Sequence, residues 1–174
     1  MVFGGTVNII SGKAGGLMEA KYTAELIAHW FIWRNLVAED KEGGDPLTLL
    51  KLLKLMYYAE GLSLAMDRGS LFADPIVAWR HGPVVIDIWE QYTNRPYNLP
   101  LADHDKQQLN QMAEDDENTM EETFLTFGQF SAWKLRNMTH EEKPWLEATE
   151  GGRIMNREIS RDTMRQYFKE NYLE

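Results

Sequence analysis

A chain of 174 residues with 44% hydrophobic and 11% aromatic residues can bury one core, which excludes an intrinsically disordered protein. The absence of cysteine excludes disulfides, thiolate metal sites and cysteine nucleophiles. The net charge of -9 argues against direct contact with nucleic acid. No apolar run approaches the roughly 20 residues of a membrane helix, so we expect no membrane contact. Together with the absence of cysteine, this leads us to expect a cytoplasmic protein.

Residues 1–17 are rich in glycine, show no strong periodicity and predict a flexible leader. They lack the basic start and the clean apolar stretch of a signal peptide. Met18 is an alternative start for the natural chain. The rest contains no internal repeat and no long linker, so we expect residues 18–174 to form a single domain.

Two helices are predicted first. Residues 22–38 carry apolar side chains at three- and four-residue steps, with Thr23 as a plausible N-cap. The strongest pattern covers residues 46–66, where Asp45 can cap the helix and Pro46 suits its first position. The inward stripe of this second helix is expected to contain Leu49, Leu52, Leu53, Met56, Ala59 and Met66.

Gly61 is a weak point inside this helix, costing about 1 kcal/mol relative to alanine, and we expect it to admit another helix closely. Residues 76–80 are rich in strand formers and predict a strand. Gly82 and Pro83 predict a sharp turn, with a helix starting at Pro83. The acidic segment 102–122 predicts either an exposed helix or a partly mobile segment.

In the last third of the chain, Ser131 and Ser160 are the predicted N-caps of two helices, and Pro144 opens a short turn between them. Residues 153–159 predict a second short strand. The predicted fold is therefore mainly α, a compact helical domain with one small antiparallel β pair built from residues 76–80 and 153–159.

The sequence offers little catalytic chemistry. The leader lacks the spacing of a phosphate-binding loop, the four histidines lack H-x-x-x-H spacing, and no G-x-S-x-G motif is present. We therefore predict no catalytic residue, no cofactor and no metal site. His140, Glu141 and Glu142 do offer acid–base groups, but Thr139 and Glu142 also have the spacing of a capping box.

The run Arg80-His81-Gly82-Pro83 has two readings. A strand followed by a turn and a helix start can present amides to an anion, whereas glycine and proline can simply set a turn.

A resemblance rests on four motifs in chain order. Residues 52–61 (LLKLMYYAEG) resemble the characteristic helix of the Panacea family, the SocA-like antitoxin domain also described as phage-associated GepA-type. Residues 71–85 (LFADPIVAWRHGPVV) are similar to the family's next segment, which is followed by a helix that carries an aromatic residue, matched by Trp89 or Tyr92. The later matches are Thr139-His140 with Pro144-Trp145 and Tyr167-Phe168-Lys169. Order and rough spacing agree over residues 22–170.

The resemblance implies a bacterial or prophage antitoxin, encoded beside a protein toxin and neutralising it by direct contact. One relative acts as an adaptor that delivers its toxin to a protease. The family has no established catalytic residues, so none is carried over and we expect no enzyme. The loop from Glu39 to Asp45 looks longer than usual, and segment 102–122 is not diagnostic of the family, so the partner stays open.

Because tryptophan and arginine are common interface anchors, we expect an exposed contact surface near the second helix and the first strand. Its predicted residues are Lys54, Tyr58, Trp79, Arg80, His81 and Trp89. Trp79 and Trp89 can alternatively belong to the core. Two other functions stay open: an acidic regulator that masks a nucleic-acid-binding surface of its target, and an uncharacterised hydrolase using His81 or His140.

Overall fold

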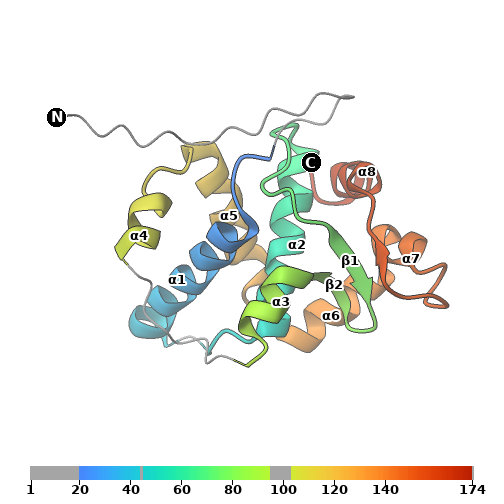
Figure 1. Ribbon diagram of the computed structural model, residues 1–174, viewed down its shortest axis with the longest axis horizontal. Coiled ribbons are helices and arrows are strands. Elements are labelled where there is room, and N and C mark those ends of the chain that lie inside the picture. Colours follow the sequence, from blue (N-terminus) through green and yellow to red (C-terminus); the bar gives the residue numbers. More distant parts are fainter. Residues whose placement is uncertain (1–19, 44, 95–102, 174) are drawn as a thin grey trace.

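The computed structural model describes residues 20–43, 45–94 and 103–173, so the predicted leader lies outside the described residues. In chain order the elements are α1 (Ala24–Glu42), α2 (Leu49–Ala65), β1 (Ile76–Trp79), β2 (Gly82–Val85), α3 (Ile86–Tyr92), α4 (Asp103–Leu109), α5 (Glu114–Phe127), α6 (Ala132–Glu141), α7 (Lys143–Ala148), β3 (Arg157–Glu158) and α8 (Arg161–Asn171). Figure 1 shows α2 near the centre, with α1, α4 and α5 on one side and the small sheet, α7 and α8 on the other. The mainly α fold with a small antiparallel sheet is confirmed.

Helix α2 is buried on every side, so the predicted inward stripe was too narrow: every residue from 52 to 63 is buried. The helix begins at Leu49, later than predicted. The hydroxyl of Thr48 accepts a hydrogen bond from the backbone N–H of Lys51 and so takes the capping role expected of Asp45. Pro46 therefore precedes the helix.

The other predicted N-caps are confirmed. The side chains of Thr23, Ser131 and Ser160 each accept a hydrogen bond from the backbone N–H three residues later, at α1, α6 and α8. These caps depend only on residues close in sequence, which is why the sequence predicts them.

The sheet has the order β2-β1-β3, one strand more than predicted. The expected pairing of β1 with the later segment is confirmed, but only for Arg157 and Glu158. The helix predicted to start at Pro83 begins at Ile86 instead, because residues 82–85 pair with β1 as a hairpin. Gly82 has φ of +97°, and the edge position of β2 tolerates a proline that lacks an N–H.

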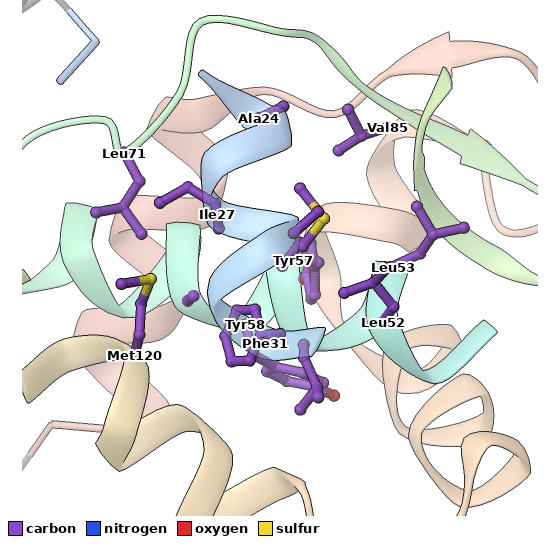
Figure 2. Packing of buried hydrophobic residues seen from close by; sticks show 14 of the residues in the cluster. Ala24, Ile27, Phe31, Leu52, Leu53, Tyr57, Tyr58, Leu71, Val85 and Met120 are labelled. Atoms are coloured by element: carbon purple, nitrogen blue, oxygen red, sulfur yellow. The ribbon is translucent and has the colours of Figure 1, made fainter. Parts of the chain in front are cut away.

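The acidic segment forms two helices, α4 and α5, separated by a short turn. Helix α5 contributes Met120 to a core that also receives Ile27 and Phe31 from α1. Figure 2 shows these side chains gathered around Tyr57 and Tyr58 of α2.

Gly61 confirms the expected close approach of a second helix. A Cβ atom built on Gly61 would lie 2.4 Å from the ring of Phe168, so α8 packs where only a glycine leaves room. In the part of the chain that the structure describes, no helix is both long enough and apolar enough to cross a membrane.

Candidate functional site

A pocket of about 510 Å³ lies where the β1–β2 hairpin meets the first turn of α2. Such a volume falls within the range of about 300–1,000 Å³ typical of ligand-binding pockets. Apolar side chains from α2, the hairpin and α3 dominate its wall. The lining residues are Leu49, Leu50, Leu53, Trp79, Arg80, His81, Val84, Trp89, Met155 and Asn156.

Two tryptophans make one wall of the pocket. The rings of Trp79 and Trp89 meet edge to face, with centroids 5.2 Å apart. The carbonyl oxygen of Trp79 accepts a 3.1 Å hydrogen bond from the indole N–H of Trp145 in α7. The indole N–H of Trp79 itself is buried without a hydrogen-bond partner, which costs free energy in the isolated chain.

Four of the six predicted contact residues therefore come together, since Trp79, Arg80, His81 and Trp89 all line this pocket. Arg80 and His81 are exposed, whereas the two tryptophans are half-buried and pack against the core. The structure thus combines the two readings of these tryptophans. Their contact with a partner stays a prediction.

The expectation of exposure was wrong for Lys54 and Tyr58, whose exposed fractions are both 0%. Sequence spacing placed them on a polar face of α2, but that face is covered by other elements. The Nζ of Lys54 donates a 2.8 Å hydrogen bond to the carbonyl oxygen of Pro83. Burial, with a smaller contribution from the guanidinium of Arg136, lowers the pKa of Lys54 to about 7.

Gly82 lies against this lysine. A Cβ atom on Gly82 would approach the Cε of Lys54 and the Oγ1 of Thr139, each to 2.7 Å. The hairpin can therefore close over Lys54 only with glycine at this position. The turn predicted at Gly82 and Pro83 lies at Arg80 and His81 instead. Gly82 and Pro83 begin strand β2, where the anion-site reading required a helix start.

Glu142 does not form the capping box considered for it, because Thr139 lies inside α6. Its carboxylate is buried and accepts hydrogen bonds of 2.9, 2.8 and 2.7 Å from the hydroxyls of Tyr57, Tyr58 and Tyr172. Burial raises the pKa of Glu142, although the three hydrogen bonds act to lower it. The same surroundings raise the pKa of each tyrosine. This cluster joins α2 to the C-terminal end of α8.

A second buried carboxylate anchors α8 at its other end. Glu60 accepts hydrogen bonds from the hydroxyl of Ser70 at 2.6 Å and the backbone N–H of Leu71 at 2.8 Å. The Nε of Arg161 pairs with it at 2.8 Å. These contacts leave Glu60 surrounded by donors, as a buried charge requires.

His140, one of the candidate hydrolase groups, fastens the hairpin to α6. Its two ring nitrogens lie 2.6 Å and 2.8 Å from the carbonyl oxygens of Arg136 and Arg80, and its ring packs on Trp145 with centroids 3.9 Å apart. Both ring nitrogens lie against backbone carbonyl oxygens, so this histidine is suited to holding the hairpin in position against α6. His81, the other candidate, lies exposed at the pocket.

Sequence reasoning did not assign six pocket residues to the contact surface: Leu49, Leu50, Leu53, Val84, Met155 and Asn156. It also missed Trp133, whose ring lies beside His81. Trp133 is 60% exposed. The sequence did contain a signal for Trp133: it is out of phase with the other apolar positions of α6, which predicts that its side chain is exposed. Among the described residues, no group of three or more histidine, aspartate or glutamate side chains is arranged to hold a metal ion.

The comparisons with known proteins point to one family. The family model for the antitoxin SocA-like, Panacea domain matches residues 52–146, which is more than half of the chain. The match runs from the first turn of α2 into α7 and contains the whole β1–β2 hairpin. No curated protein and no solved structure matches the chain. From the family match and the motif order together, the chain belongs to the SocA-like antitoxin family and carries its Panacea domain.

Proposed function

We propose that this chain is an antitoxin that neutralises a protein toxin encoded beside it, by direct protein–protein contact and without catalysing a reaction. The family match over residues 52–146 is the observation that carries the proposal. The matched region includes the hairpin and the pocket wall formed by Trp79 and Trp89, so the family's defining segment contributes most of the concave surface.

The chemistry of the pocket supports a binding role. Its lining is mainly apolar, and the polar side chains at its edge include Arg80 and His81, which are exposed. Tryptophan and arginine are enriched among residues that dominate binding energy. Three buried ionisable groups among the described residues, Lys54, Glu60 and Glu142, hold elements of the fold together.

The direct test is expression of the neighbouring gene alone and together with this chain in a bacterial host. We expect growth arrest from the neighbouring gene alone, rescue by co-expression and co-purification of the two proteins as a complex. Toxin level is measured in the same cultures, because adaptor-mediated degradation would remove the toxin, whereas simple masking would leave it at full level. A neighbouring gene that is harmless, or a toxin that this chain neither binds nor counteracts, would contradict the proposal.

A further inference from the structure

The pocket continues onto an exposed aromatic residue of α6. The ring of His81, which lines the pocket, meets the ring of Trp133 edge to face with centroids 5.8 Å apart. The guanidinium carbon of Arg136 lies 5.9 Å from the centroid of the same tryptophan ring. Trp133 is therefore held between two neighbours although it is 60% exposed. A large aromatic ring held in place at the surface is a frequent anchor of protein interfaces.

The arginines of the described chain divide into two groups. One group pairs with carboxylates and comprises Arg34, Arg68, Arg153, Arg161 and Arg165. The other group makes no ion pair anywhere in the described residues and comprises Arg80, Arg136 and Arg157.

Two of the three unpaired arginines lie at the pocket. Arg80 lines it, and Arg136 contacts Trp133. Arg157 pairs directly with Ala78, so its side chain lies on the face of the sheet opposite Trp79. Arg136 also keeps its Nε buried without a hydrogen-bond partner. In a chain with a net charge of -9, uncompensated guanidinium groups beside an apolar pocket form a local region of opposite charge. Such a region favours a partner surface that carries carboxylates.

We propose that the hairpin surface, defined as the pocket together with Trp133 and the guanidinium groups of Arg80 and Arg136, binds a segment of the toxin in which large apolar side chains are flanked by aspartate or glutamate. The apolar side chains fill the pocket and cover Trp133, and the carboxylates pair with the arginines. This inference rests on the proposed antitoxin function and adds where the toxin binds and what chemistry the bound segment has.

Two other occupants predict different results. An apolar small molecule would fill the pocket and would need neither Trp133 nor the arginines. A second copy of this chain would make the free protein dimeric, with Trp133 at the interface. The proposed segment instead requires the pocket, Trp133 and the positive charge together.

The experiment measures the affinity of the full chain for the toxin encoded by the neighbouring gene, by titration calorimetry. The variants are Trp133→Ala and Arg80→Glu. The matched controls are Trp33→Ala, another exposed tryptophan, and Lys41→Glu, an exposed cation, both on α1. We expect each surface variant to weaken binding at least about tenfold and each control to stay within about twofold. Unfolding curves that match the wild type confirm that each variant folds.

The results separate this inference from the proposed function. Toxin binding that persists unchanged in both surface variants would show that the toxin binds elsewhere and would overturn the inference while the antitoxin function stands. A wild-type chain that does not bind the toxin would overturn both.

A second measurement does not depend on the toxin. Phage-displayed random peptides are selected on the immobilised full chain and, in parallel, on Trp133→Ala. Enrichment of apolar sequences flanked by aspartate or glutamate, lost on the variant, supports the inference. Enrichment that is basic, or that is equal on both proteins, contradicts it. A free chain that sediments as a dimer and becomes a monomer in Trp133→Ala would identify a second copy as the occupant and would also overturn it.

Discussion

The amine of Lys54 donates a 2.8 Å hydrogen bond to the carbonyl oxygen of Pro83, from a position in α2 with no exposed surface. This contact attaches the central helix to the second strand of the hairpin whose first strand carries Trp79. The wall of the pocket is therefore held by a titratable group that water does not reach.

Stability should depend on pH through Lys54. The pKa falls from 10.5 to about 7 on folding, so the unfolded chain holds a proton that the folded chain has lost between these values. The free energy of unfolding should therefore rise as the pH increases from 7 to 9, by at most about 1.4 kcal/mol per pH unit. Returning the sample to pH 7 should restore the lower value. Urea unfolding at pH 7, 8 and 9 measures this slope. Lys54→Met should flatten it, and the exposed-lysine variant Lys134→Met should keep it; equal slopes in both variants would refute the assignment to Lys54.

Removal of the Glu142 carboxylate should loosen α8. Glu142→Ala leaves three tyrosine hydroxyls without their acceptor, and we expect a loss of about 3–5 kcal/mol in denaturant unfolding. Glu142→Gln keeps one acceptor oxygen and should lose less. The exposed neighbour offers the control, since Glu141→Ala should change stability by no more than about 0.5 kcal/mol. A loss no larger in Glu142→Ala than in Glu141→Ala would mean that the cluster does not hold the helix.

Glu142 should also contribute a pH dependence of opposite sign to that of Lys54. Its folded pKa is raised, so the folded chain retains a proton that the unfolded chain releases. Stability from this group is full below the ordinary glutamate pKa of 4.5 and is lost as the pH rises through the folded value. The fall should be absent in Glu142→Gln, which unfolding measurements between pH 4 and 7 would detect.

Gly61→Ala should destabilise the chain, although the same change in an exposed helix is stabilising by up to about 1 kcal/mol. The new methyl group would lie 2.4 Å from the ring of Phe168, which must move. We expect a loss of about 1–3 kcal/mol by thermal unfolding. Phe168→Ala removes the obstacle, so the double variant should lose clearly less than the sum of the two single losses. Additive losses would indicate that the ring does not cause the effect.

Arg161 should matter far more than its neighbour Arg165. Arg161→Met leaves the buried carboxylate of Glu60 without its cation and should cost about 3–5 kcal/mol. Arg165 pairs with Asp67 at the surface, and Arg165→Met should cost at most about 1 kcal/mol. Adding Glu60→Gln to Arg161→Met should recover part of the loss, because the uncompensated charge is then gone. The measurement is the denaturant midpoint of the wild type, of Arg161→Met, of Arg165→Met and of the double variant. Similar losses of stability in the two arginine variants would refute the prediction that Arg161 matters more.

The β2 strand shows where prediction from local pattern failed. Residues 84–92 have the apolar spacing of a helix, and a proline often opens one, so the helix was placed three residues too early. Pairing with β1 and the positive φ of Gly82 hold residues 82–85 in a strand instead. Pairing between strands is a tertiary interaction, and it overrides a short helical pattern.

Part of the pocket lining was predictable from the sequence. Trp79, Arg80, His81 and Trp89 are close in sequence, on one hairpin and its following helix, so local reasoning was enough to place them together at one pocket. Leu50 and Met155 reach the pocket from distant parts of the chain. Lys54 seemed exposed because helical spacing tells which residues share a face but not what covers that face.

The amino-acid sequence by itself determined helices α1, α6 and α8 with their caps at Thr23, Ser131 and Ser160, and it determined the family, because each depends on residues that are neighbours along the chain. Only the tertiary structure decided which buried charges meet. Glu60 finds Arg161 across 101 positions, and Glu142 finds Tyr58 across 84. Packing around α2 brings these residues together although they are far apart in sequence. Because the buried carboxylates are removed from water, each requires a specific partner, and no local sequence pattern encodes which one.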